Sequence, residues 1–263
     1  MVQEALGLTK RIREEAPQFR LGAQLLEDRI RFLDQFDLLP ESLSAQVSNS
    51  EAECRLQQAA TEFKSSSQNP ELITKIFQTI WQARSEIIGM NFEVPPCPYT
   101  REKLAEFKRK GIRVGYLPPE LATQQNRYIL GEIFPQMRSN SLQKDNLVVN
   151  DEDQSGWFNY EASIDAPYPN TTEKLLSNKV TRKGKRLLTL NQYIVATQDS
   201  KLFTGQFLDE GLTWARLGSR FHGRVVDVGT RKDGYLYVWS DLKPNHHSLH
   251  IGGRSSEDPC PTS

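Results

Sequence analysis

The chain has few cysteines and no long apolar run. Its three cysteines stand at positions 54, 97 and 260, far apart in 263 residues. That pattern is not a disulfide framework, and it favours a reducing compartment, with the cytoplasm as the expected location. No apolar stretch approaches the roughly 18 residues that span a bilayer. The charged start, MVQEALGLTKRIREEA, also lacks the apolar centre of a signal peptide, so we expect neither a leader nor a membrane.

An excess of charge of either sign is absent as well. Lys and Arg together number 33, and so do Asp and Glu. Dedicated nucleic-acid binders usually contain a basic domain, so the balance argues against that class but leaves room for a local basic patch. The chain lacks a phosphate-binding glycine loop, Rossmann-type glycines, a G-x-S-x-G elbow and cysteine pairs at metal or redox spacing. We therefore assign no catalytic residues, and an enzyme is not the leading expectation.

Helical periodicity dominates the first part of the chain. Between residues 17 and 39, apolar residues recur every three or four positions, as on one face of a helix. A second helix is expected over 50–64. A third begins at Asn69-Pro70, where a capping residue precedes a first-turn proline. These helices predict a small antiparallel bundle over residues 1–92, ended by the prolines at 95, 96 and 98.

Beyond residue 93 the pattern mixes short helices with strands. The strongest strand signal is a pair of β-branched and aromatic runs, 224–228 and 235–239, around the turn Asp233-Gly234. They predict an antiparallel hairpin near residues 224–240. We therefore predict an α+β fold with a helical domain (1–92), a mixed, β-rich domain (93–253) and a flexible polar tail (254–263).

The third helix carries an unusually broad apolar stripe. Ile80, Trp81, Ile87 and Ile88 spread over more than one narrow face, which indicates burial on more than one side. Together with the missing catalytic motifs, this supports the leading hypothesis of a non-enzymatic interaction or assembly protein. The helical part would bind a protein partner or a second copy, and the β-rich part would supply the scaffold or recognition surface.

A basic segment over residues 174–232 supports the first alternative, nucleic-acid binding. It holds twelve Lys or Arg residues and few acids, and aromatic residues lie among them and just beyond. Cations that hold phosphates and rings that stack bases are the components of single-strand sites. The candidate residues are Lys179, Arg182, Lys183, Lys185, Arg186, Arg220 and Arg224. The acidic loop 151–153 is itself a candidate for general acid–base catalysis or for binding a hard cation. Alternatively, the loop faces this basic segment, which would explain the zero net charge.

The histidines support the second alternative, a metal-dependent hydrolase. All four lie in the last 42 residues, and His246 and His250 would share a face of a helix or a strand. With His222, Asp241 or Cys260 as a third ligand, they would suit zinc or another divalent metal. The spacing matches no standard metal motif, and solvated loop histidines explain it equally well.

Three segments of the C-terminal part resemble stretches of uncharacterised bacterial proteins. They are 156–167 (GWFNYEASIDAP), 190–210 (LNQYIVATQDSKLFTGQFLDE) and 214–253, which begins WARLGSRFHGRVVDVG. The resemblance covers roughly the last 110 residues. It implies a bacterial, cytoplasmic source, but no activity, cofactor or site residue.

Overall fold

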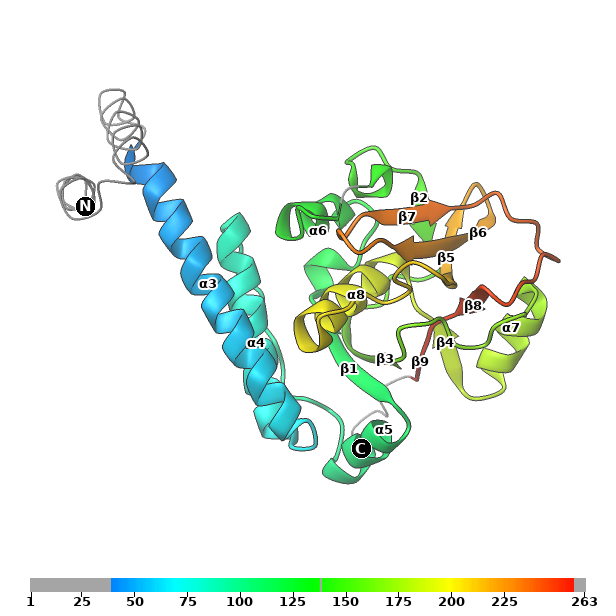
Figure 1. The fold of residues 1–263 in the computed structure, drawn as a ribbon, viewed down its shortest axis with the longest axis horizontal. Coiled ribbons are helices and arrows are strands. Elements are labelled where there is room, and N and C mark those ends of the chain that lie inside the picture. The colour runs from blue at the N-terminus through cyan, green and yellow to red at the C-terminus, as the bar shows by residue number, and fades with distance from the viewer. Residues whose placement is uncertain (1–38, 138, 258–263) are drawn as a thin grey trace, which may run out of the picture. The chain divides into compact units, whose positions relative to one another are not determined.

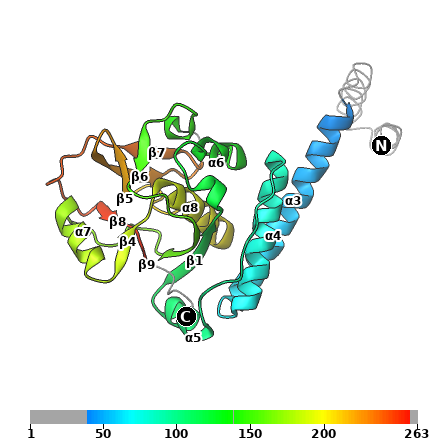
Figure 2. The same ribbon diagram turned by 180° about the vertical axis from the view of Figure 1, so that it is seen from behind.

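The structure, a computed structural model, describes residues 39–137 and 139–257, with side chains from residue 51 onward. The chain divides into two units, Met1–Glu53 and Cys54–Ser263. The helix expected over 17–39 falls almost entirely outside the described residues. All contacts discussed below lie within the second unit, which Figures 1 and 2 show from opposite sides.

The elements alternate helices with short strands. In chain order they are α3 (Leu39–Ser66), α4 (Pro70–Ile88), α5 (Arg101–Arg109), β1 (Ile112–Leu117), η2 (Pro119–Leu121), α6 (Arg127–Ile133), η3 (Asn140–Leu142), β2 (Val148–Asn150), β3 (Gly156–Glu161), α7 (Glu173–Thr181), β4 (Lys185–Leu187), α8 (Leu190–Thr204), β5 (Trp214–Phe221), β6 (Arg224–Thr230), β7 (Leu236–Trp239), β8 (Ile251–Gly253) and β9 (Ser255–Glu257). Helices followed by a strand-rich part confirm the α+β prediction.

Local sequence explains where the main helices begin and end. The Asn69 side chain accepts from the backbone N–H groups of Glu71 and Leu72, which caps α4, and Gly89 ends it in the left-handed conformation. Thr189 caps α8 with a reciprocal capping box to Gln192. Twelve of the fifteen residues of α8 are buried, as expected for a helix at the centre of a core rather than on its surface.

The largest sheet has the strand order β2-β5-β6-β7, with β8 added in parallel against β5. The predicted hairpin is confirmed: β6 and β7 are antiparallel, from Asp227 opposite Trp239 to Thr230 opposite Leu236. The register between β5 and β6 shifts between Arg216 and Arg220, and such a bulge bends a strand. In this order β2 and β7 are the two edges. Two further antiparallel pairs, β1 with β3 and β4 with β9, flank this sheet.

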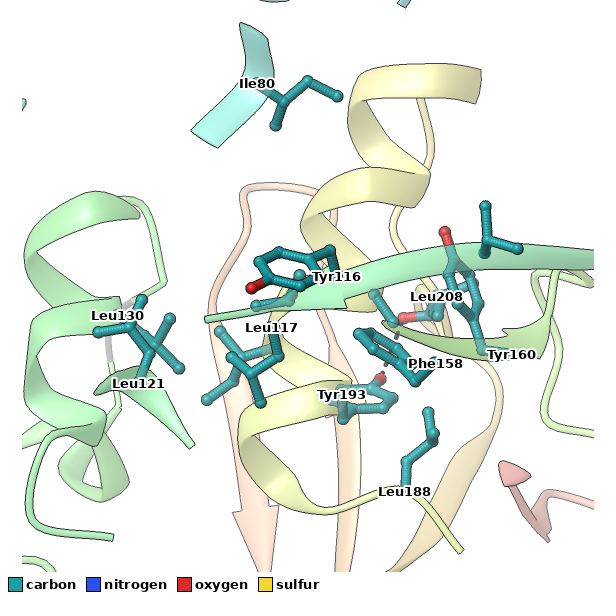
Figure 3. Packing of buried hydrophobic residues seen from close by; sticks show 14 of the residues in the cluster. Ile80, Tyr116, Leu117, Leu121, Leu130, Phe158, Tyr160, Leu188, Tyr193 and Leu208 are labelled. Carbon is teal, nitrogen blue, oxygen red and sulfur yellow. Dashed lines mark hydrogen bonds between the residues drawn. The ribbon is translucent and has the colours of Figure 1, made fainter. Parts of the chain in front are cut away.

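One hydrophobic core joins the helices to the strands of the second unit. Figure 3 shows side chains of α4, β1, β3 and α8 gathered around Tyr116, Phe158 and Tyr193. The expected domain boundary between residues 92 and 93 falls inside this unit. The core crosses that boundary, because Trp81 donates from Nε1 to the carbonyl of Tyr116 at 3.1 Å and its ring packs edge-on against the Tyr116 ring. The prolines after residue 93 therefore direct the chain without separating two cores.

The flexible tail predicted from residue 254 is wrong for residues 254–257. Ser255–Glu257 form β9, which pairs with β4, and Arg254 is fully buried. Polar composition suggested a frayed end, but these side chains have buried polar partners. The Ser255 hydroxyl, for example, donates to Glu161 at 2.6 Å. Residues 258–263 lie outside the described residues.

Candidate functional site

A groove of about 590 Å³ runs along the free edge of β7. One wall is the strand itself with its flanks, residues 235–241. The other wall is the segment that leads from η3 into β2, and Phe221 at the end of β5 also lines the space. The groove therefore collects residues from both edge strands of the curled sheet, β2 and β7. Both strands lie close together at one side of the sheet in Figure 1.

The backbone of β7 presents unused hydrogen-bonding groups to this groove. The N–H of Arg231 donates to the carbonyl of Tyr235 across the hairpin turn, at 2.9 Å. Hydrogen-bonded pairs alternate along an antiparallel ladder, so Tyr237 and Trp239 are bonded to β6 in this register. The N–H and C=O groups of Leu236 and Val238 consequently point away from β6. Within the described residues, β7 pairs with no second strand.

Exposed aromatic and aliphatic side chains surround these groups. Trp239 is 51% exposed and Tyr237 40%, and both rings lie within about 6 Å of the Trp214 ring on β5. On the opposite wall Leu147 is 56% exposed. Apolar side chains on both sides of an open strand edge form a surface that gains free energy when something covers it.

The charges in the groove are of one sign. Asp145 and Asp241 line it, and no Lys or Arg is among the described residues that do. Asp241 lies 3.6 Å from Arg224, an exposed contact that solvent largely screens. Hydroxyl and amide side chains complete the lining, at Ser139, Asn140, Ser141, Gln143, Asn146 and Ser240. The described lining therefore carries two carboxylates and no Lys or Arg, which favours a positively charged ligand over a phosphate.

Most of the predicted nucleic-acid residues face carboxylates of the same chain. Arg220 contacts Asp151 at 3.2 Å and Glu173 at 2.5 Å, and Arg186 contacts Glu152 at 2.8 Å. The expectation that the acidic loop faces the basic segment is thereby confirmed. The remaining candidates are placed as follows: Lys185 contacts Glu161 at 3.3 Å, Arg224 contacts Asp241, and Lys179, Arg182 and Lys183 are exposed at the end of α7 and the turn after it.

The structure does not bring the predicted metal ligands together. No group of three His, Cys, Asp or Glu side chains in the described part of the chain is arranged to hold a metal ion. The carbonyl of His246 accepts from buried Arg216, and the carbonyl of His250 accepts from the N–H of Trp214. His222 occupies a left-handed turn position between β5 and β6, and the adjacent Gly223 lines a hollow together with Pro244 and Asn245. Cys260 lies outside the described residues.

The predicted partner surface on α4 needs correction. Ile80 and Trp81 are fully buried in the core of this chain, so no partner reaches them. Ile88 is half-buried against the same core, and only Ile87 is largely exposed, at 42%. The broad apolar stripe of α4 was predicted to be buried on more than one side, and the core of the chain does cover it in this way. The covering elements are α8, β1 and the 92–94 segment rather than another molecule.

Asp241 was a candidate metal ligand, and the other groove residues were not among the candidate site residues, although part of their signal was present. Tyr237 and Trp239 alternate with Leu236 and Val238, which indicates a strand with one aromatic, outward face. What the sequence does not show is that β7 ends the sheet and that residues 139–148 face it. No helix in the described residues is long and apolar enough to cross a membrane.

The fold and groove together define an α+β chain with an open sheet edge. Comparison with protein-family models, with curated proteins and with solved structures gives no match. The resemblance to bacterial proteins over the C-terminal part therefore stays a prediction.

Proposed function

We propose that this chain is a protein-interaction module that binds an extended peptide segment of a partner as an added strand on β7. The observation that carries the proposal is the unpaired edge of β7 along a groove of about 590 Å³. Strand addition takes its affinity from main-chain hydrogen bonds and its specificity from pockets for alternate side chains. Both components are available here, at Leu236 and Val238 for the backbone and at Trp239 and Leu147 for side chains.

The lining specifies the chemistry of the peptide. Exposed apolar residues on both walls favour apolar side chains at alternate positions. Asp145 and Asp241 favour Lys or Arg, and disfavour acidic residues. An added strand must also donate hydrogen bonds to β7, so proline is excluded at the alternate positions whose N–H faces β7.

The same charges favour a peptide over a nucleic acid at this groove. A single strand would bring phosphates beside two carboxylates, and the described lining holds no Lys or Arg to neutralise them. The exposed basic residues Lys179, Arg182 and Lys183 belong to α7 and its following turn, and they do not line the groove.

The test begins with selection of random dodecapeptides on the immobilised full chain. We expect enriched sequences with alternate apolar residues, at least one Lys or Arg, and no proline at the positions whose N–H faces β7. Affinity of a labelled enriched peptide is then measured by fluorescence anisotropy for the wild type, Val238→Pro and Val238→Thr. Proline removes a groove-facing N–H without removing a ladder bond to β6, whereas threonine keeps that N–H. Proline should weaken binding about tenfold, the equivalent of one or two lost hydrogen bonds, and threonine about twofold or less.

Two side-chain variants separate specific peptide recognition from nonspecific hydrophobic binding. Trp239→Ala should weaken binding of the enriched peptide, and Leu212→Ala should not, since Leu212 is more exposed but does not line the groove. Equal affinity of Val238→Pro, Val238→Thr and wild type would refute strand addition, as would failure to enrich any sequence. Binding of single-stranded polythymidine at physiological salt, abolished by neutralising Lys179, Arg182 and Lys183, would replace the proposal with nucleic-acid binding.

A further inference from the structure

Arg127, the first residue of α6, is a fully buried guanidinium whose hydrogen-bond acceptors are all neutral. It donates from Nε to the side-chain oxygen of Asn191 at 2.7 Å. From Nη1 it donates to the side-chain oxygen of Asn146 at 2.7 Å and to the carbonyl of Val148 at 2.8 Å. Nη2 donates to the side-chain oxygen of Asn150 at 3.1 Å. One side chain thus holds four acceptors in place.

No carboxylate bonds directly to this guanidinium among the described residues. Burial lowers the pKa of Arg127 to about 10, and Asp153 opposes that shift, but its carboxylate accepts from Asn150 at 3.3 Å. The other buried arginines each bond to a carboxylate: Arg84, Arg216 and Arg254. An apolar side chain would avoid the cost of burying a charge, so position 127 uses the planar fork of donors to join parts of the chain.

Three of the four acceptors belong to one short segment, residues 146–150, which forms the wall of the groove opposite β7. The side chains of Asn146 and Asn150 bond to Arg127, whereas Leu147 between them is largely exposed and lines the groove. This alternation is that of a strand. Arg127 therefore holds the wall from inside the core and does not line the groove itself.

The fourth acceptor connects the wall to the central helix. Asn191, near the start of α8, also donates from Nδ2 to the carbonyls of Leu121 and Thr123, at 2.6 and 3.0 Å. The wall is thus fixed through Arg127 and Asn191 to the most buried helix of the described chain.

The same guanidinium also occupies the outer edge of β2. The N–H of Asp151 donates to the carbonyl of Gly218 on β5 at 2.9 Å, and hydrogen-bonded pairs alternate along the ladder. The carbonyl of Val148 therefore points away from β5, where it accepts from Arg127. This edge acceptor of β2 is already used, whereas β7 pairs with no second strand in the described residues.

We infer that Arg127 is a positioning residue of the peptide groove and makes strand pairing one-sided. An added peptide forms its main-chain hydrogen bonds with β7 alone and meets the facing wall through side chains, chiefly at Leu147. This inference rests on the proposed function, because it assigns how that groove is held and which edge pairs.

The first test is an N-methyl scan of the enriched peptide against the wild-type chain, followed by fluorescence anisotropy. Each methyl group removes one backbone donor. One-sided pairing predicts a loss of about tenfold at alternate nitrogens and less than about threefold at the nitrogens between them. Equal losses at both sets of positions overturn the inference, because the peptide would then pair on both sides. If no peptide binds the wild-type chain, the proposed function fails and this inference fails with it.

A double-mutant cycle then tests Arg127. Arg127→Met should weaken peptide binding about tenfold, because the wall loses its support. Leu147→Ala should weaken binding about fivefold in the wild-type chain but less than about twofold beside Arg127→Met, since the wall is already displaced. Val238→Pro should weaken binding by the same factor in both backgrounds, because β7 is unchanged. A general loss of stability would not produce this difference between Leu147 and Val238.

The matched control is Arg254→Met, which also removes a buried guanidinium, but one whose partners do not line the groove. It should change affinity by less than about twofold. Where Arg127→Met fails to fold, Gln124→Met replaces it, because Gln124 donates from Nε2 to the carbonyl of Asn146 at 2.9 Å without lining the groove. It should weaken binding about threefold and couple to Leu147→Ala in the same way. Wild-type affinity of the Arg127 and Gln124 variants, or simple additivity with Leu147→Ala, overturns the inference while leaving strand addition intact.

Discussion

The buried pair formed by Arg254 and Asp209 gives the sharpest test of the fold. Arg254 donates from Nε and Nη2 to the two carboxylate oxygens of Asp209, at 2.7 and 3.0 Å, and both side chains are fully buried. The same guanidinium also donates to the carbonyls of Glu161 and Ile164. Asp209 in turn accepts from the Tyr193 hydroxyl at 3.1 Å. The pair thus joins the last described strand to the centre of the core.

Replacing Arg254 by methionine removes the positive charge but keeps a long apolar side chain. Asp209 is then left ionised in the core with only hydroxyl partners, and two buried carbonyls lose their donors. Breaking a buried pair from one side costs about 3 to 5 kcal/mol. In a unit of this size each kcal/mol lowers the melting temperature by about 2 to 4 °C, so we expect a decrease of roughly 6 to 20 °C.

The assay is urea unfolding of the full chain followed by circular dichroism. A matched control is Arg231→Met, because Arg231 contacts Asp233 at 3.2 Å on the surface and its loss should cost less than about 1 kcal/mol. A double variant, Arg254→Met with Asp209→Asn, removes the stranded charge and should recover part of the lost stability. Asparagine also tolerates the positive φ of 53° at position 209. The reasoning fails if Arg254→Met costs no more than the surface control, or if the two substitutions add without coupling.

Two further predictions follow from single positions. Gly252→Ala should destabilise the chain strongly, because a Cβ at this position would overlap the carbonyl oxygen of Pro167. Gly229→Ala is the control and should be mild, because a Cβ there meets no atom closer than 3.4 Å. Thermal unfolding compares the melting temperatures of the two variants. Burial raises the pKa of Asp227 to about 6 despite the Arg216 charge beside it. The folded pKa lies above the unfolded value, so the favourable contribution is present below about pH 3.9 and is lost as pH rises through 6. The unfolding free energy of Asp227→Asn, relative to wild type, should therefore rise by up to about 3 kcal/mol between pH 4 and 7, and a flat difference in urea titrations would contradict this.

Local signals were enough to predict much of the secondary structure. The cap at Asn69-Pro70 and the Asp233-Gly234 hairpin both stand where the sequence placed them. Each depends on residues within a few positions of one another, so a pattern in one window contains the whole interaction.

The errors share a different cause, because each concerns a partner distant in sequence. Arg254 is predicted to be in a frayed tail because its carboxylate partner is 45 residues away. Trp81 was assigned to an interface because the strand that covers it lies 35 residues downstream. Hydrophobicity and polarity in one window show that a side chain needs partners, but not whether these come from the same chain.

The sequence indicated only part of the candidate site, for the same reason. The aromatic face of β7 is a local pattern, and its rings are among the aromatic residues that suggested base stacking near the basic segment. Its meaning depends on the facing wall: Asp145 and Leu147, from a segment about 90 residues earlier, turn the surface into an acidic and apolar groove. Several of the basic residues that suggested nucleic-acid binding form ion pairs within the chain, with Asp151, Glu152 and Glu173.

The charges of the described residues are sorted in space rather than mixed uniformly over the surface. Most buried and half-buried cations are paired internally, as Arg216 is with Asp227 and Arg254 with Asp209. What remains among the described residues is a groove lined by Asp145 and Asp241, with no Lys or Arg in the described lining. We therefore expect a groove-binding peptide to lose affinity when its Lys or Arg residues are replaced by Glu, and fluorescence anisotropy with the charge-reversed peptide tests this.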